Sequence, residues 1–410
     1  MKIKEQIELQ QISIDELHPD PANPRRISDQ ELEALTRSIR EFGLVDPIIA
    51  RREDKTVIGG HQRLLAARRL GHKTVPVIFA DLSLEQARLF NIALNKISGS
   101  FDQELLARLL EDLGKTPDVD LTLSGFGEDE LKKLLKSLDA REKRERVEDF
   151  DLEEAIKAAQ SAPVAKQGDI WLLGDNKLAC GDSTDGEAVQ RLMEQSRATM
   201  VFTDPPYNVD YGSSKNPRHK IRSIENDNQN SGDWEAFCKA MFSNFKLFNA
   251  GDIYMWGASG PDGMRMRLWL VEMGCHWSAT IVWKKQQLVL SPANYQRIYE
   301  PCFYGWFDKS SFRGDRKQTE VWETDRPLKS DLHPTMKPLP LIERAIQNSS
   351  EPGDKVMDLF LGSGSTLIAC ERTGRICYGM ELEPLYVDIA KMRWEAFTGE
   401  KARLCEEEKE

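Results

Sequence analysis

The chain has 410 residues, of which 40% are hydrophobic and 30% are charged, with a formal net charge of −11; this length predicts about two or three domains, and the composition is typical of an ordinary soluble protein. Because no apolar run reaches about 18 residues and the N-terminus lacks an apolar core, we expect neither a transmembrane helix nor a signal peptide. The seven cysteines are scattered without a C-x-x-C pair, so we expect a cytoplasmic protein with no disulfide framework and no metal site.

The acidic charge is unevenly distributed along the chain. Residues 208–337 contain 18 Lys and Arg against 15 Asp and Glu, so the rest of the chain carries −14 to give the total of −11. A less acidic segment is where a surface that contacts DNA is expected. The same balance is also ordinary for any protein surface, so this signal alone decides nothing.

The first 95 residues predict a small α+β unit. Ser28 followed by Glu31 is typical of a capping box at the start of a helix, and apolar residues at helical spacing continue as far as Gly43. A second helix is expected over 64–70. Strands, the first with a turn, are expected over 12–17, 47–51, 57–58 and 75–80.

A Gly59-Gly60 turn leads into the second helix of this unit. Free backbone N–H groups at a helix N-terminus bind anions, and Arg63 would add a bidentate contact. The alternative is a plain joint between strand and helix that needs glycine for a positive φ. The spacing alone leaves both interpretations open.

Three stretches of this unit, N-P-R-R at 23–26, E-F-G-L-V-D-P-I at 41–48 and V-I-G-G-H-Q-R-L-L at 57–65, resemble the ParB/sulfiredoxin-like N-terminal domain. In that family a G-E-R-R-like box binds nucleotide phosphates or a nucleic-acid backbone. Only Gly60 and Arg63 match the box here, so the resemblance implies a nucleotide or DNA-backbone site at these two positions. The missing acidic residue argues against a hydrolytic role.

Residues 96–150 predict a helical segment and a charged linker. Helical spacing of apolar residues extends over 84–95, 103–112 and 128–138. The charges of 139–146 alternate in sign, so this run is expected to be a solvated linker or a helix extension and not a DNA-binding arm. The main domain is then expected over 151–400, with an acidic tail over 401–410.

The main domain opens with a predicted hairpin over 171–182 that turns at Asp175-Asn176, and Asp182-Ser183 is expected to cap a helix around 188–194. The next strand, 200–202, runs into Asp204-Pro205-Pro206-Tyr207. The prolines cannot donate to a strand ladder, so the strand ends there. Asp204 is therefore expected at the carboxyl end of a strand, where open α/β sheets bind their ligands.

Asp204 and its neighbours suit chemistry on the exocyclic amino group of a base. Such an amine is a poor nucleophile because its lone pair is delocalised into the ring. A carboxylate and a backbone carbonyl that accept its two N–H bonds would localise the pair, and the Tyr207 ring would hold a base flipped out of the stack. The alternative is a tight Asp-Pro turn with a packed tyrosine, which four residues alone do not exclude.

A glycine-rich turn is predicted between a strand that ends at Asp358 and a helix that ends at Gly374. It contains Gly362 and Gly364, and Glu381 lies 17 residues after Gly364, near the end of the next strand. Glycines let a ligand approach such a turn, and an acidic residue about 20 residues on binds ribose hydroxyls. The pattern favours a nucleoside cofactor, and the missing third glycine disfavours NAD.

Four motifs together resemble the amino-group DNA methyltransferases that use S-adenosylmethionine: T-D-P-P-Y-N at 203–208, H-P-T-M-K-P at 333–338, D-L-F-L-G-S-G-S-T at 358–366 and G-M-E-L-E-P-L-Y at 379–386. Because the catalytic motif precedes the cofactor motif, the resemblance implies the permuted β class, with a Rossmann-like α/β fold and a target-recognition insert at about 213–330. Relatives often carry glycine where this chain has Leu361. We therefore expect the Leu361 side chain to point away from the cofactor.

The resemblance also assigns roles to single residues. Asp204 and the Pro205 carbonyl would bind the target amino group, Pro206 would stiffen the same turn, and Tyr207 would stack on the base. S-adenosylmethionine would be held by Glu381 at its ribose, by Lys337 beside its methionine end, by Asp182 near its adenine, and by a turn built from Asp358, Phe360, Gly362, Gly364 and Thr366. The alternative to a cofactor-binding role is a plain surface lysine for Lys337 and a helix cap for Asp182.

Within the expected insert, Lys284, Arg297 and Arg313 are candidates for contacts to DNA phosphates. The large aromatic residues there, Trp256 and Phe303 among them, are expected to be core residues. Cys302 follows a proline, as the reactive cysteine of ring-carbon cytosine methyltransferases does. Its other surroundings differ, so we expect a buried, small apolar residue.

The resemblance implies a site-specific methyltransferase of the restriction-modification type that acts on the N6 amino group of adenine in double-stranded DNA. Adenine is preferred because Asp204 opens the motif, whereas cytosine-N4 relatives more often open it with serine. Cytosine-N4 methylation, protein or RNA methylation, and a non-catalytic ParB-like DNA clamp remain alternatives. A homodimer is compatible with the resemblance, and the recognition sequence cannot be read from the chain.

Overall fold

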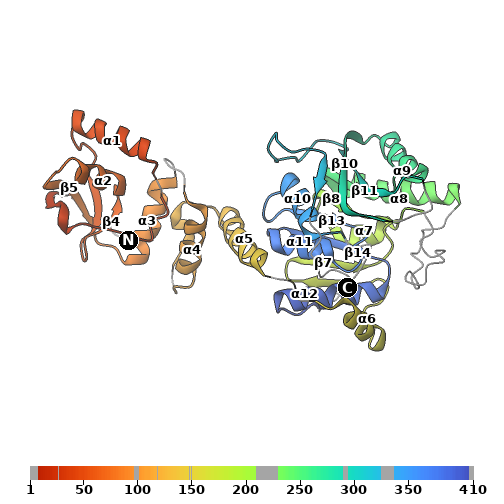
Figure 1. Cartoon of the computed structure of the whole chain (residues 1–410). Coiled ribbons are helices and arrows are strands. Elements are labelled where there is room, and N and C mark those ends of the chain that lie inside the picture. Colours follow the sequence, from red (N-terminus) through yellow and green to blue (C-terminus); the bar gives the residue numbers. More distant parts are fainter. Residues whose placement is uncertain are drawn as a thin grey trace. The chain divides into compact units, whose positions relative to one another are not determined.

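The computed structural model describes residues 8–25, 27–96, 101–117, 119–146, 148, 150–208, 230–289, 294–324 and 337–405. The chain divides into two compact units, Met1–Asp139 and Ala140–Glu410 (Figure 1). Across these described ranges, no helix combines the length and the apolar character that crossing a membrane requires.

The first unit is an α+β domain built on a five-stranded sheet. The strand order is β1-β5-β3-β4-β2, with β1 (Leu9–Ser13), β2 (His18–Pro19), β3 (Ile48–Arg51), β4 (Thr56–Gly59) and β5 (Thr74–Ala80). The 3-10 helix η1 (Ile14–Glu16) and the helices α1 (Asp29–Phe42) and α2 (His61–Arg69) accompany the sheet. Ile48, Leu64, Val75 and Val77 are fully buried in its core.

The capping box predicted for α1 is confirmed. The Ser28 hydroxyl accepts a hydrogen bond from the Glu31 N–H at 3.3 Å, and the Glu31 carboxylate accepts one from the Ser28 N–H at 2.9 Å. Gly43, at φ 76°, ends the helix. Helix α2 begins at His61, three residues earlier than the apolar spacing predicts, because Gly60 takes a left-handed conformation and starts the helix directly after β4.

A helical segment follows the first sheet. It contains α3 (Leu84–Lys96), α4 (Gln103–Gly114), the 3-10 helix η2 (Leu121–Ser124) and α5 (Glu128–Glu145). Leu89, Ile92, Leu106 and Leu110 form its buried core. Helix α5 continues past the predicted 128–138 through the mixed-charge run to Glu145, so of the two interpretations of that run the helix extension is the one confirmed.

The second unit is built on a ten-stranded sheet in the order β12-β10-β11-β9-β8-β13-β14-β7-β6-β15. Its strands are β6 (Ile170–Leu173), β7 (Asn176–Cys180), β8 (Ala198–Thr203), β9 (Asn249–Trp256), β10 (His276–Val289), β11 (Arg297–Trp306), β12 (Val321–Glu323), β13 (Lys355–Asp358), β14 (Ile376–Glu381) and β15 (Arg403–Leu404). The five strands from β9 through β7 run parallel to one another, whereas β10, β11, β6 and β15 add antiparallel pairings at the two sides.

Helices cover both faces of this sheet (Figure 1). One face packs against α10 (Leu339–Ser349), α11 (Ser365–Thr373) and α12 (Pro384–Thr398), and the other against α7 (Gly186–Met193), α8 (Ser231–Phe248) and α9 (Pro261–Glu272). Alternate residues of β8 serve the two cores, with Met200 and Phe202 on the first face and Val201 on the second. The predicted Rossmann-like α/β fold is confirmed. Helix α6 (Leu152–Ser161) packs against α12 in a separate small cluster.

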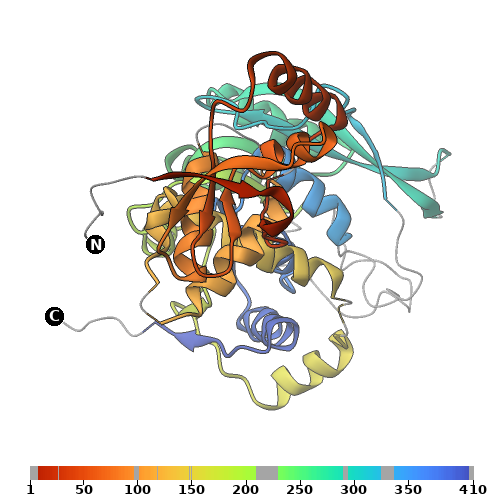
Figure 2. The ribbon, with the colours of Figure 1, turned by 90° about the vertical axis from the view of Figure 1, so that its left-hand side faces the viewer.

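The described part of the stretch at 213–330 contributes strands to the ten-stranded sheet and does not form a separate insert. Strands β9, β10, β11 and β12 all come from this stretch. Figure 2 shows the β10–β11 hairpin running outward beyond the helices at one side of the unit. A role in target recognition would therefore fall on elements that also complete the fold.

Two local details near the start of the second unit differ from the prediction. The β6–β7 hairpin turns at Gly174-Asp175 and not at Asp175-Asn176, because Gly174 supplies the positive φ of 60°. Asn176 is instead a buried strand residue. Helix α7 is capped by Asp185, whose side chain accepts from the N–H groups of Glu187 and Ala188, whereas Asp182 accepts from Thr184 within the preceding turn.

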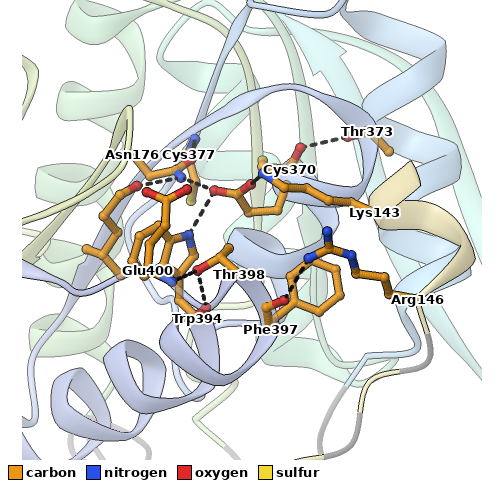
Figure 3. Close-up of polar contacts among 12 residues, drawn as sticks. Lys143, Arg146, Asn176, Cys370, Thr373, Cys377, Trp394, Phe397, Thr398 and Glu400 are labelled. Carbon is orange, nitrogen blue, oxygen red and sulfur yellow. Dashed lines mark hydrogen bonds and ion pairs between the residues drawn. The ribbon is translucent and has the colours of Figure 1, made fainter. Parts of the chain in front are cut away.

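A buried polar cluster joins the end of α5 to α11 and α12 (Figure 3). The Glu371 carboxylate accepts hydrogen bonds from the Lys143 ammonium at 2.6 Å, the Asn176 amide at 2.7 Å and the Trp394 indole at 2.8 Å. The Asn176 side chain in turn accepts from the Cys377 N–H at 2.7 Å. The side chains of Lys143 and Glu371 are only 13% and 10% exposed, so Lys143 is not the solvated residue that its charge pattern predicts.

Removal of the Glu371 carboxylate is expected to destabilise the second unit. In Glu371→Ala the buried Lys143 ammonium and two further donors lose their acceptor, and breaking a buried pair from one side costs about 3–5 kcal/mol. All nine tryptophans follow residue 140, so tryptophan fluorescence during urea unfolding reports on this unit alone.

The control is Glu235→Ala, which removes an exposed carboxylate from its pair with Lys239 on α8. An exposed helical pair contributes less than about 1 kcal/mol. Equal losses of unfolding free energy in the two variants would contradict the anchoring role of Glu371.

Candidate active site

The candidate site lies where the chain leaves the sheet at two adjacent parallel strands, β8 and β13. From these strands the connections diverge, with β8 leading through α8 to β9 on one side and β13 leading through α11 to β14 on the other. Open α/β sheets bind ligands at such a switch point. Asp204 follows β8 and Asp358 ends β13, so the two predicted motifs meet at one edge of the sheet.

Asp358 connects the two motifs directly. Its carboxylate accepts hydrogen bonds from the Thr203 hydroxyl at 2.9 Å, the Thr366 hydroxyl at 2.6 Å and the Phe360 N–H at 3.1 Å. Burial raises the pKa of Asp358 to about 6, although these three donors oppose the shift. The residue immediately before Asp204 is therefore tied to the glycine-rich turn.

Both oxygens of Asp204 are engaged. Lys337 donates to Oδ2 at 2.6 Å and the Tyr207 hydroxyl donates to Oδ1. Lys337 also donates to the Tyr207 oxygen at 3.2 Å, and its ammonium faces the Trp256 ring at 5.3 Å. A carboxylate has about four acceptor positions, so Asp204 retains room for a further donor.

A second carboxylate shares Lys337. Glu300 on β11 lies 3.0 Å from the Lys337 ammonium and also pairs with Lys285 on β10. Burial opposes ionisation of Glu300, but the two lysines outweigh burial and lower its pKa to about 2. Burial also opposes the charge on Lys337, but Asp204 and Glu300 prevail and raise the pKa of this lysine. Burial raises the pKa of Asp204 as well, against the influence of Lys337.

The glycine-rich turn is open at one of its two glycines. A Cβ at Gly362, where φ is 54°, would meet no atom within 4 Å, whereas one at Gly364 would lie 3.2 Å from Ala390. Gly362 thus leaves space beside the turn, and Gly364 allows α11 to pack closely on α12. Helix α11 carries no side-chain cap, so its first N–H groups lie at the same turn.

Glu381 lies beside this turn at the end of β14. Its carboxylate accepts hydrogen bonds from the Gly362 N–H at 2.8 Å and the Glu383 N–H at 3.1 Å. Burial raises the pKa of Glu381 to about 7 despite these two donors. Asp182 is close in the sheet, because the Gly181 N–H donates to the Glu381 carbonyl at 3.0 Å.

The Leu361 side chain is directed into the core. A Cβ on Gly379 of β14 would come within 2.8 Å of Leu361, so the absence of a side chain at 379 makes the space that this leucine fills. Leu361 is 5% exposed. Its neighbour Phe360 packs edge-on against Phe237 of α8 at 6.1 Å between ring centroids.

The predicted anion site of the first unit is partly neutralised. Arg63 pairs with Asp46 and donates to the Pro47 carbonyl at 3.2 Å. A Cβ on Gly60 would lie 3.0 Å from the Arg63 guanidinium, so the glycine permits this close approach. A ligand at Gly60 and Arg63 stays a prediction.

The three predicted DNA contacts are spread over different elements. Lys284 on β10 pairs with Glu323 at 2.8 Å, and Arg313 pairs with Glu351 at 2.7 Å. Both basic side chains are about half exposed, and exposed pairs of this kind contribute less than about 1 kcal/mol, so little free energy opposes their exchange for a phosphate. Arg297 begins β11, and its side chain lies outside the described part of the chain.

Two residues of this site, Glu300 and Lys285, have no distinctive local pattern in the sequence, because they occupy ordinary strand positions. Thr203 opens the T-D-P-P-Y-N motif, but the motif does not predict that its hydroxyl donates to Asp358. Cys302 is fully buried, as expected, and burial raises the pKa of its thiol.

Known protein families match three parts of the chain. A DNA methylase family model matches residues 198–392, a ParB N-terminal domain model matches residues 2–96, and a ParB-methyltransferase HTH domain model matches residues 104–167. The last match includes α4 and α5, an assignment that helical spacing alone does not provide.

Individual relatives agree with these matches. The type II methyltransferase M.HpaI of Haemophilus parainfluenzae is 26% identical over 244 residues, which cover 53% of this chain and 74% of that protein. The type II methyltransferase M2.DpnII of Streptococcus pneumoniae is 26% identical over 236 residues, which cover 50% and 85%.

Solved structures of DNA methyltransferases also align with about half of the chain. The complex of M1.HpyAVI with SAM shares 22% identity over 53% of this chain and 98% of its own, with a TM-score of 0.39. The PvuII DNA methyltransferase, described as cytosine-N4-specific, shares 15% identity over 55% and 94%, with a TM-score of 0.40. The three family matches and the two relatives show that the chain contains a domain of the N6/N4 DNA methylase family, preceded by a ParB N-terminal domain and a ParB-methyltransferase HTH domain, and that it is homologous to type II methyltransferases.

Proposed function

We propose that this protein transfers a methyl group from S-adenosylmethionine to the N6 amino group of adenine at specific sites in double-stranded DNA. The observation that carries the proposal is the placement of Asp204 one strand away from the glycine-rich turn, held there by the hydrogen bond from Thr203 to Asp358. A hydrogen-bond acceptor for an amine and a turn suited to a nucleoside thus lie at one sheet edge.

The residues at the turn fit S-adenosylmethionine. Gly362 leaves open space where any other residue would place a Cβ, and the Glu381 carboxylate at the end of β14 can accept from ribose hydroxyls. Asp182 and Phe360 border the same edge, where an adenine ring and its amino group would find an acceptor and an apolar surface. Bound there, the cofactor supplies an electrophilic methyl group on a positively charged sulfur.

Asp204 is proposed to prepare the target amine. The carboxylate and the Pro205 carbonyl accept its two N–H bonds, which draws the lone pair away from the ring and toward the methyl carbon. With the cofactor bound, formation of the N–C bond would leave the electron pair of the broken S–C bond on sulfur. Asp204 would accept the surplus amino proton and pass it to water. The chain contributes mainly position and a preorganised negative charge.

Adenine is proposed as the target because the motif opens with Asp204 and not with serine. Both amines need the same two acceptors, so the distinction comes from the family pattern and not from the geometry. Cytosine N4 is the second candidate, since the matched family includes both activities by name.

For the first unit we propose a nucleotide or the DNA backbone as ligand of the turn at Gly60. The turn offers backbone N–H donors at the start of α2. Arg63 would contribute charge after exchanging Asp46 for a phosphate.

The variant Asp204→Ala is expected to lower methyl transfer by about 10³-fold, since it removes the acceptor that activates the amine. Tritiated methyl incorporation into DNA measures the loss. Asp308→Ala, which removes an exposed carboxylate paired with Arg197, is the matched control and is expected to keep full activity. A folded Asp204→Ala protein with substantial activity would refute the proposed role.

The modified base should be N6-methyladenine. DNA methylated by the purified protein would be digested to nucleosides and analysed by mass spectrometry. N4-methylcytosine as the sole product would replace adenine by cytosine while leaving the rest of the proposal intact.

Cofactor affinity should depend on pH through Glu381. Only its ionised carboxylate accepts from both ribose hydroxyls, and with a pKa of about 7 roughly a tenth of the carboxyl groups are ionised at pH 6. Calorimetric titration with S-adenosylmethionine should therefore give affinity that rises about tenfold between pH 6 and pH 8. Glu381→Gln should bind more weakly and show no such rise; an unchanged pH dependence in that variant would exclude Glu381 as its origin.

A further inference from the structure

Four charged side chains of alternating sign form a row beneath the candidate active site. Lys285 on β10 pairs with Glu300 on β11, Glu300 lies 3.0 Å from the Lys337 ammonium, and Lys337 lies 2.6 Å from Asp204. The first two come from the stretch between the catalytic and cofactor motifs. The row therefore reaches from the β10–β11 hairpin to the carboxylate that is proposed to hold the target amine.

The row is largely, though not fully, shielded from water, and Lys337 is its most buried member. The side chains of Lys337, Lys285, Glu300 and Asp204 are 7%, 18%, 22% and 29% exposed. A buried ammonium that loses its carboxylate pays a large desolvation penalty. Lys337 therefore needs a carboxylate partner at every stage of the reaction.

Binding of the target base brings a further donor to Asp204, which then competes with the donors already there. Both of its oxygens are engaged, one by Lys337 and the other by the Tyr207 hydroxyl. An amine that attacks the methyl carbon needs a short, well-aligned hydrogen bond to this carboxylate. The hydrogen bond from Lys337 draws on the electron density of the same carboxylate. The stronger this bond is, the weaker Asp204 becomes as an acceptor for the amine.

We infer that Glu300 is a positioning residue for methyl transfer, which takes over the Lys337 ammonium as Asp204 turns to the target amine. This inference rests on the proposed function. Glu300 is already within ion-pair distance, so the transfer needs only a small movement of the Lys337 side chain, without admission of water. In this role, Lys337 keeps Asp204 ionised while no base is bound. When the target base is bound, Lys337 gives up its hydrogen bond to Asp204 and pairs with Glu300.

The position of Glu300 also links this transfer to the hairpin. Glu300 pairs in register with Trp283, and Lys285 lies in the irregular part of β10 that follows Lys284. A DNA contact that shifts the hairpin would move Glu300 relative to Lys337. The charge row would then bring Asp204 to full acceptor strength when DNA is in place.

The test is Glu300→Gln in the full-length protein. Without the negative charge, Lys337 has Asp204 as its only carboxylate in the row and holds it more tightly, so kcat is expected to fall about 10–100-fold. The KM for DNA and the Kd for S-adenosylmethionine are expected to change less than about threefold, because Glu300 contacts neither in this scheme.

A pH profile separates this role from a merely structural one. The negative charge of Glu300 raises the pKa of Asp204, so Glu300→Gln should move the acid limb of kcat to lower pH. The other titratable groups that influence Asp204 or its partners, all retained in this variant, are Lys337, Lys285, Tyr207, Cys302, Asp358 and Arg267. Glu300→Asp keeps the charge, and it should leave the acid limb near its original pH while lowering kcat, because its shorter side chain reaches Lys337 less well.

The matched control is Glu323→Gln, which removes a carboxylate from the pair with Lys284 on the same strands without touching Lys337. It should keep the kcat and the acid limb of the unmodified protein. If Glu300→Gln behaves like Glu323→Gln in both measurements, the inference is overturned. If Glu300→Gln does not fold, an unchanged kcat in Glu300→Asp overturns it equally. An unmodified protein that methylates no DNA would instead refute the proposed function.

Discussion

The hydrogen bond between the Thr203 hydroxyl and the Asp358 carboxylate is the constraint on which the candidate site depends. It joins the last residue of β8 to the last residue of β13, so it holds the proposed catalytic motif beside the glycine-rich turn. The two motifs are 155 residues apart in the chain, and adjacency in the sheet alone would fix only the backbone. Asp358 also accepts hydrogen bonds from the Thr366 hydroxyl and the Phe360 N–H. One buried carboxylate therefore orients the segment that carries Asp204, the glycine-rich turn and the start of α11.

A second constraint is the charge balance around Asp204. A carboxylate that must accept from an amine has to stay ionised in a buried position, and burial opposes ionisation. Lys337 compensates, but a single lysine would also occupy the acceptor. A second carboxylate resolves this, since Glu300 supplies an alternative partner and Lys285 balances its charge. The four charges of the row sum to zero and each has an oppositely charged neighbour, which offsets the desolvation penalty of burying them.

Local sequence patterns predicted much of the fold and the outline of the site. The capping box at Ser28, the helix end at Gly374 and the order of strand, turn and helix around Gly362 follow from rules that act over a few residues. The failures have a common physical cause. Asn176 looks like a turn residue and Lys143 like a solvated one, but each is buried against Glu371, which lies 195 and 228 residues away. Glu300 was missed for the same reason, because strand order, which no local pattern records, brings β11 near Lys337.

The cluster at Glu371 also bears on where the methylase domain begins. The motifs proposed for catalysis and cofactor binding all follow residue 168, and the charged linker is expected to end near 150. Yet the compact second unit starts at Ala140, and residues before 150 contribute packing as well as charge. Besides Lys143, Glu148 pairs with Arg393 of α12, and the Arg146 carbonyl accepts from Arg372 of α11 at 2.9 Å. A chain cut at 150 would leave the buried side chains of Glu371 and Arg393 without their ion-pair partners, Lys143 and Glu148. Loss of activity in such a fragment would therefore report on folding before it reported on any role of the ParB-like unit. A cut at 140 keeps these contacts. A fragment that starts there therefore tests whether the second unit is active without the ParB-like unit.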